Sequence, residues 1–206
     1  MEQQDTECDA WRQLLDLIET AAADGHKEFA PARELGEEAW RQIITLPPSI
    51  GKLKSVEHLF LYGSHLVRIP PEIGEMTYLK KFDPYVSYSL HWFPYEITRC
   101  QQLKNSRVST RTLYGNHKHR LPFPQLPNLG ILETDSSLRC SVCNQQMETN
   151  CVKQVWISLR VATDVLPLLV NACSNQCVEA LPPSAPCHVE GAHLGGRNLI
   201  QPPCMY

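Results

Sequence analysis

The chain lacks an excess of basic charge. Its 206 residues include 19 lysines and arginines against 22 aspartates and glutamates, so the formal net charge is −3. This balance disfavours a general nucleic-acid-binding protein, which neutralises phosphates with a basic surface, although it leaves room for a local basic patch. The residues that would supply such a patch are Lys118, Arg120, Arg139, Lys153 and Arg160.

Two further absences bear on location. No apolar run approaches the roughly 20 residues that a transmembrane helix requires. Residues 1–13 show neither the basic region nor the apolar region of a secretory signal. We therefore expect a cytoplasmic protein without a membrane partner.

Recognised enzyme motifs are also missing. The sequence contains no G-x-S-x-G, no G-x-x-x-x-G-K-S/T, no G-x-G-x-x-G and no H-E-x-x-H. The adjacent carboxylates Glu37 and Glu38 fit the polar face of a helix. We therefore predict no catalytic residues and no enzymatic activity. An enzyme of unrecognised type that uses His117, His119 or the tail histidines His188 and His193 is an alternative.

Cysteine, by contrast, is plentiful. Nine cysteines form an odd set, and in a reducing compartment this number favours metal binding over a disulfide framework. Two close pairs stand out, Cys140-x2-Cys143 and Cys173-x3-Cys177. Four thiolates in two such pairs suit tetrahedral Zn²⁺, and they leave no open position for water, so we predict a structural zinc ion. Spacing alone does not separate zinc from iron, and four loosely placed thiols are the alternative.

The residues between the two cysteine pairs support a small metal-binding module. Residues 152–161 are rich in β-branched side chains and predict a strand, and residues 165–172 predict its antiparallel partner. A short helix is expected after Ser174, which can cap it, and before Pro182. A knuckle, a hairpin and a helix in this order are typical of a treble-clef zinc module.

A spacing of 23 to 24 residues recurs between positions 46 and 103. Leu46-Pro47 returns as Ile69-Pro70 and again as Phe93-Pro94. Residues 56–76 resemble the leucine-rich repeat consensus, with Ser64 where that family prefers Asn. In this pattern Leu59 and Leu61 point into the core, because side chains alternate along a strand.

Two helices are expected before the repeats, over residues 9–23 and within 31–44, where they would cap the array. The predicted fold class is α+β: a short leucine-rich repeat solenoid with an N-terminal helical cap and a C-terminal zinc-binding hairpin and helix. The predicted segments are a cap (1–44), about three degenerate repeats (45–113), a linker or wrapping loop (114–138), a zinc-binding module (139–182) and a Pro/Gly-rich tail (183–206).

If the leucines of the repeat point inward, the residues between them form an outward face. Aromatic and arginine side chains are enriched at protein interfaces, so this face predicts a protein or peptide partner. Coverage of the same face by the tail or by residues 84–96 is the alternative. The candidate partner-binding residues are His58, Phe60, Tyr62, Lys81, Asp83, Tyr85 and Arg107.

Three stretches together carry a resemblance to a group of bacterial leucine-rich repeat proteins without an established activity. They are ITLPPSIGKLKSVEHLFLYGSHLVRIPPEIGEMTYL (43–79), LHWFPYEITRC (90–100) and WISLRVATDVLPLLVNACSNQC (156–177). The resemblance implies a short solenoid with a zinc-binding tailpiece. Leucine-rich repeat proteins as a class bind other proteins, which is an analogy at the level of the fold.

Overall fold

The computed structural model describes residues 3–127 and 138–203. Contacts divide the chain into two compact units. Unit 1 comprises Met1–Thr112 with Val161–Asp164, and unit 2 comprises Leu113–Arg160 with Val165–Tyr206. Part of the predicted linker (128–137) and the end of the predicted tail (204–206) lie outside the described residues.

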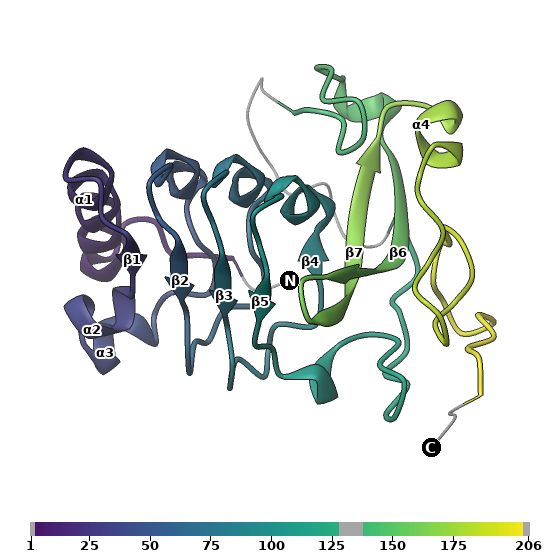
Figure 1. Cartoon of the computed structure of the whole chain (residues 1–206), viewed down its shortest axis with the longest axis horizontal. Coiled ribbons are helices and arrows are strands. Elements are labelled where there is room, and N and C mark those ends of the chain that lie inside the picture. The colour runs from purple at the N-terminus through teal and green to yellow at the C-terminus, as the bar shows by residue number, and fades with distance from the viewer. Residues whose placement is uncertain (1–2, 128–137, 204–206) are drawn as a thin grey trace. The chain divides into compact units, whose positions relative to one another are not determined.

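A parallel sheet of very short strands organises unit 1 (Figure 1). Its order is β1 (Glu28–Phe29), β2 (His58–Phe60), β3 (Lys81–Asp83) and β5 (Asn105–Ser106). Leu59 pairs in register with Phe82, 23 residues later, and both side chains are fully buried. The recurrent spacing therefore places equivalent apolar side chains side by side in the core.

Short 3₁₀ helices recur at the same spacing in unit 1, namely η1 (Pro48–Lys52), η2 (Pro71–Glu75) and η3 (Tyr95–Arg99). Each follows an extended proline, whose restricted backbone favours this turn. They pack closely: a Cβ added to Gly74 would lie 2.6 Å from the carbonyl oxygen of Glu96. The close approach of η2 and η3 therefore requires glycine at this position.

The predicted α+β leucine-rich repeat solenoid is wrong. The described residues form a mixed α/β structure with the small parallel sheet, a small mixed sheet that includes β6 (Lys153–Val161) and β7 (Asp164–Ala172), and few helices. A solenoid needs about three or more stacked repeats to build its core. The spacing predicts which side chains are buried, as for Leu59, Leu61 and Ile73. It does not determine how many units stack or which sheet follows them.

The N-terminal helices agree with the sequence only in part. The helix α1 (Asp9–Ala23) has the predicted bounds and buries Leu14 and Ile18. The second predicted helix is divided into α2 (Pro31–Leu35) and α3 (Glu37–Trp40), because Gly36 between them adopts φ 78°. None of the helices in the described part of the chain combines the length and hydropathy needed to cross a bilayer.

Buried serines link neighbouring turns of unit 1. The hydroxyl oxygens of Ser64 and Ser87 lie 2.6 Å apart, and the backbone N–H of Val86 donates to Ser109 Oγ at 2.8 Å. Of these three serines, Ser64 is the one at the position where the leucine-rich repeat pattern prefers Asn. Ser87 and Ser109 follow it at intervals of 23 and 22 residues, so the recurrent spacing carried a signal for them.

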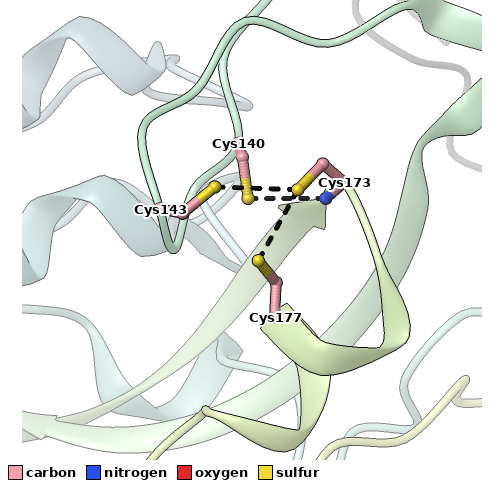
Figure 2. Close-up of side chains that lie close together, drawn as sticks. All are labelled: Cys140, Cys143, Cys173 and Cys177. Carbon is pink, nitrogen blue, oxygen red and sulfur yellow. Dashed lines mark hydrogen bonds between the residues drawn. The ribbon is translucent and has the colours of Figure 1, made fainter.

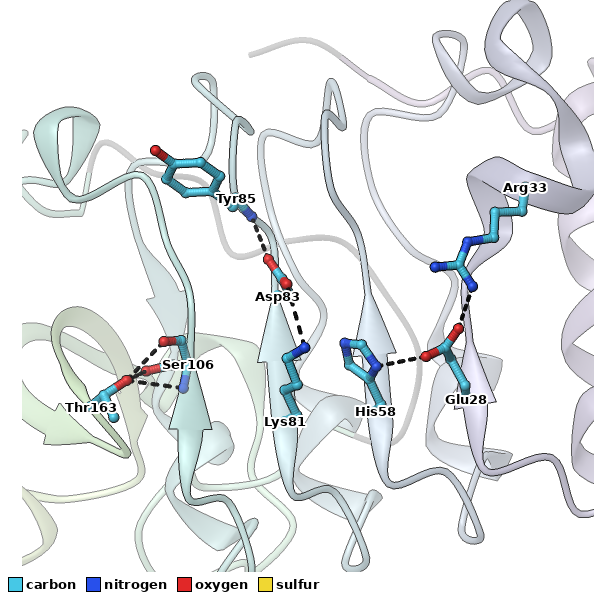
Figure 3. Close-up of polar contacts among 8 residues, drawn as sticks. All are labelled: Glu28, Arg33, His58, Lys81, Asp83, Tyr85, Ser106 and Thr163. Carbon is cyan, nitrogen blue, oxygen red and sulfur yellow. Dashed lines mark hydrogen bonds and ion pairs between the residues drawn. The ribbon is translucent and has the colours of Figure 1, made fainter.

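A side chain forms hydrogen bonds to the backbone of the edge strand β5 of the parallel sheet. The hydroxyl of Thr163, which belongs to unit 1, donates to the carbonyl of Ser106 at 2.8 Å and accepts from its N–H at 3.1 Å (Figure 3). Ser106 Oγ also lies 2.6 Å from a carboxylate oxygen of Asp164. These bonds satisfy backbone groups that would otherwise be open to another strand.

Unit 2 contains the predicted helix and the predicted hairpin except for the tip of the hairpin, residues 161–164, which belongs to unit 1. The strands β6 and β7 are joined by Ala162-Thr163, with Ala162 at φ 52°, and α4 (Asn175–Glu179) follows β7. Trp156 is fully buried and its ring centroid lies 5.6 Å from that of Phe123. The remaining short elements of the chain are β4 (Phe93–Pro94), η4 (Thr110–Thr112) and η5 (Thr149–Cys151).

Candidate functional site

Four cysteines meet in unit 2. The sulfur atoms of Cys140, Cys143, Cys173 and Cys177 all lie within 4.8 Å of one another (Figure 2). Cys173 Sγ lies 3.6 Å from Cys143 Sγ and 3.5 Å from Cys177 Sγ. Tetrahedral Zn²⁺ with bonds of about 2.3 Å separates its sulfur ligands by about 3.8 Å. The two predicted pairs therefore form a cluster of the size that one metal ion requires.

The first pair is held by a tight turn that packs against β7. Asn144 adopts φ 61°, and its N–H donates to the carbonyl of Cys140 at 3.0 Å. Ser141 exchanges two hydrogen bonds with Asn171 of β7: its N–H donates at 2.8 Å, and its hydroxyl accepts at 2.9 Å. The turn is thereby anchored two residues before Cys173.

The second pair is placed by the start of α4. Ser174 is the N-cap, and its hydroxyl accepts from the N–H of Cys177 at 3.2 Å. This cap satisfies one of the free N–H groups at the helix start and begins the helix between the two cysteines. Cys173 and Cys177 can therefore direct both sulfurs to the same point, as Figure 2 shows.

The pKa values of the thiols fit a site that needs a cation. Burial raises the pKa of Cys140, but backbone N–H bonds from Cys143, Cys173 and Val142 outweigh it and lower the pKa to about 7. Hydrogen bonding to Cys177, Cys143 and Cys140 raises the pKa of Cys173 to about 12. Thiolates this close repel one another, and a bound metal ion would remove the repulsion by supplying positive charge.

The other thiols and histidines lie elsewhere. Among residues 3–127 and 138–203, the four-cysteine cluster is the only group of three or more side chains that could hold a metal. Cys151 and Cys187 are exposed and outside it. His193 is part-buried and packs edge-on against Phe123 at 4.6 Å, and burial lowers its pKa to about 4.

Aromatic side chains gather on the outward face of the parallel sheet. The rings of Phe60 and Tyr62 are stacked at 6.0 Å, and that of Tyr85 follows at 6.1 Å from Tyr62. These three residues are called the aromatic row. Tyr62 is 43% exposed and Tyr85 is 37% exposed, so the row presents apolar surface on its face of the sheet.

Each end of the aromatic row carries a guanidinium group. Arg33 of α2 lies 4.8 Å from the ring centroid of Phe60, and Arg107 lies 4.3 Å from that of Tyr85. Arg33 also forms an ion pair with Glu28, which accepts a hydrogen bond from His58 Nδ1 at 2.7 Å (Figure 3). Arg33 and Glu28 were not predicted, since no local pattern links them to β2.

One of the predicted partner-binding residues, Asp83, is buried and differs in this from the aromatic row. Asp83 is only 1% exposed, so it offers almost no surface to a partner. Its carboxylate lies 3.9 Å from Lys81 Nζ and accepts from the N–H of Tyr85 at 3.4 Å. Lys81 itself is exposed. Asp83 therefore supports the chain around Tyr85 from below the surface.

The basic residues considered for nucleic acid all lie in unit 2. Two of them donate hydrogen bonds to backbone carbonyls of the same unit. Arg120 donates to the carbonyls of Cys187 and Pro203, and Arg139 donates to that of Asn144.

No protein-family model, curated protein or solved structure matches this chain.

Proposed function

We propose that this chain is a non-enzymatic interaction module that binds a protein or peptide through the outward face of its parallel sheet. The observation that carries the proposal is the aromatic row, partly exposed and bracketed by Arg33 and Arg107. Aromatic and arginine side chains dominate the energetics of protein interfaces, because they bury large apolar area and also form hydrogen bonds.

The second part of the proposal is a structural Zn²⁺ in the four-cysteine cluster. Four sulfur ligands fill a tetrahedral site, so no position remains for a water or substrate. This donor set supports a role in holding Cys140-Cys143 against α4 rather than a catalytic role. A thiolate site of this kind needs reduced cysteines, which is consistent with a cytoplasmic location.

Selection from a random peptide library, displayed on phage, tests the binding proposal. We expect peptides that bind the full chain with micromolar affinity and bind the variant Tyr62→Ala at least tenfold more weakly. Tyr78→Ala is the matched control, because Tyr78 is 52% exposed and lies outside the aromatic row. Equal losses for the two variants, or no selected peptide at all, would contradict the proposal.

Metal analysis of the purified protein tests the zinc proposal. We expect about one zinc per chain, and loss of the metal in Cys143→Ser, which removes an exposed ligand with little disturbance of the core. Cys151→Ser is the control, since Cys151 is exposed but lies outside the cluster. Iron in place of zinc would overturn the identity of the ion, and an absence of metal would overturn the site.

A further inference from the structure

The charged groups around the aromatic row are not equally satisfied. Arg33 is paired with Glu28, and Lys81 lies near Asp83. Arg107 differs from both. In the part of the chain that the structure describes, no carboxylate lies within ion-pair distance of its guanidinium, which lies 4.3 Å from the ring centroid of Tyr85. The face of the sheet therefore ends in one uncompensated positive charge.

The N–H donors of the Arg107 guanidinium are available to a partner, because its side chain makes no hydrogen bond within the described residues. A guanidinium is planar and carries five N–H donors in a fixed fork that matches the two oxygens of a carboxylate. The contact with Tyr85 also restricts the side chain before any partner arrives, which lowers the entropy lost on binding. Arg107 is exposed and thus suited to bidentate binding of a carboxylate.

The aromatic row supplies an apolar surface next to this charge. The Arg107 guanidinium lies over Tyr85, and Tyr85 is 6.1 Å from Tyr62. In an extended peptide, side chains at positions i and i+2 point to the same side and lie about 7 Å apart. An apolar side chain on Tyr62 and Tyr85 can therefore be followed, two residues along the peptide, by a carboxylate at Arg107.

We propose that the partner is an acidic peptide segment with an apolar residue two positions from an aspartate or glutamate, bound with its carboxylate on Arg107 and its apolar side chain on Tyr62 and Tyr85. This inference rests on the proposed function and adds the chemistry of the partner. Single-stranded nucleic acid also stacks on aromatic rings. It suits this face less well, because Glu28 lies on the same face and a single uncompensated guanidinium neutralises few phosphates.

Three peptide pools test the inference. Each pool contains labelled nine-residue peptides with Leu-x-Glu, Leu-x-Gln or Leu-x-Lys at the centre and Gly, Ser, Ala or Thr elsewhere. Fluorescence anisotropy with the full chain measures their affinities. We expect the Glu pool to bind about tenfold more tightly than the Gln pool, and the Lys pool to bind most weakly. Added salt should reduce the difference, because the ion pair is exposed.

Substitution of Arg107 tests directly whether this residue binds the carboxylate. Arg107→Glu should invert the order of affinities, so that the Lys pool binds most tightly, and Arg107→Gln should abolish the preference for the Glu pool. Arg111→Glu is the control, because it makes the same change of net charge at another exposed arginine of unit 1. Both Arg107 variants should fold, since the side chain is exposed; circular dichroism checks this.

Four outcomes would overturn the inference. If Arg107→Glu still prefers the Glu pool, Arg107 does not bind the carboxylate of the peptide. Equal binding of all pools, with loss in Tyr62→Ala, leaves the proposed function standing and removes only the acidic partner. Failure of every pool to bind the wild-type chain removes the acidic partner and counts against the proposed function. If a twelve-nucleotide oligouridine binds more tightly than the Leu-x-Glu pool, and Arg107→Glu abolishes this binding, the face binds nucleic acid instead.

Discussion

Unit 1 holds its short strands together with many equivalent contacts, whereas unit 2 gathers four sulfur atoms at one point. In unit 1, Leu59 and Phe82 occupy matching positions, and the serines at 64 and 87 are matched in the same way. In unit 2, the turn at Cys140 and the start of α4 meet at the cysteine cluster. The strands of the parallel sheet have two or three residues, whereas β6 and β7 have nine each.

This difference predicts how much stability each unit should lose when one side chain is substituted or the metal is removed. Repeated apolar contacts share the stabilisation among many side chains, so the loss of one weakens the unit by a limited amount. A metal site concentrates the stabilisation, because removal of one ligand or of the ion affects all the segments that it joins. The following experiments test that contrast, beginning with the largest expected effect.

Removal of the metal should give the largest difference in stability between the two units. Structural zinc contributes about 10 kcal/mol or more to the folding of small zinc-binding peptides. Unit 2 also has a core around Trp156, so we expect a smaller loss, about 3–5 kcal/mol, on chelation or in Cys173→Ser. Hydrogen exchange followed by mass spectrometry should show faster exchange in residues 138–147 and 173–180, but not in β2 or β3. Equal acceleration in both units would contradict the contrast.

A substitution at the contact of η2 and η3 should give the largest single effect within unit 1. Gly74→Ala places a Cβ 2.6 Å from the Glu96 carbonyl oxygen, so one turn must shift, and we expect a loss of about 2 kcal/mol. Gly51→Ala is the matched control, because its nearest contacts are at 3.2 Å and the effect should be smaller. Urea unfolding measures both. Zinc content should remain that of the wild type in each variant.

Acid should weaken unit 2 through His193. Burial lowers its pKa to about 4 from the ordinary 6.5, so the folded chain keeps it neutral while the unfolded chain protonates. Its contribution to stability is complete above pH 6.5 and is lost as the pH falls to about 4. Allowing for its partial exposure, we expect about 1–2 kcal/mol over this range.

The variant His193→Gln isolates that contribution, because glutamine does not titrate. Acid also protonates the cysteine ligands, so the quantity to compare is the difference in slope between the two proteins in the same buffers. The variant should lose less stability than the wild type between pH 6.5 and 4. Identical slopes would show that His193 is not held neutral by burial.

The smallest expected effect concerns the buried serines of unit 1. Ser87→Ala removes the hydroxyl that contacts Ser64 and Leu61, and should lower the free energy of unfolding by about 1 kcal/mol. Ser89→Ala is the control at a nearby exposed serine. If Ser87→Ala lowered stability as much as Gly74→Ala, stabilisation in unit 1 would be concentrated rather than shared.

The cysteine cluster was predictable because its chemistry is local. The pairs Cys140-Cys143 and Cys173-Cys177 each lie within one turn, and the residues between them form the expected strands. The identity of the bound ion stays a prediction. The guanidinium of Arg33 over Phe60 was not predictable, because it brings together residues that share no local pattern.

The sequence by itself determined the apolar positions that are buried in the recurrent stretch, the bounds of α1, the strands of the hairpin to within one residue, and the set of four cysteines. Each of these depends on spacing along the chain, which local geometry translates directly into a face or a turn. Only the tertiary structure decided the mixed α/β fold, the division of the second helix at Gly36 and the burial of Asp83. These depend on which distant segments pack together, and a periodic pattern is compatible with more than one such packing.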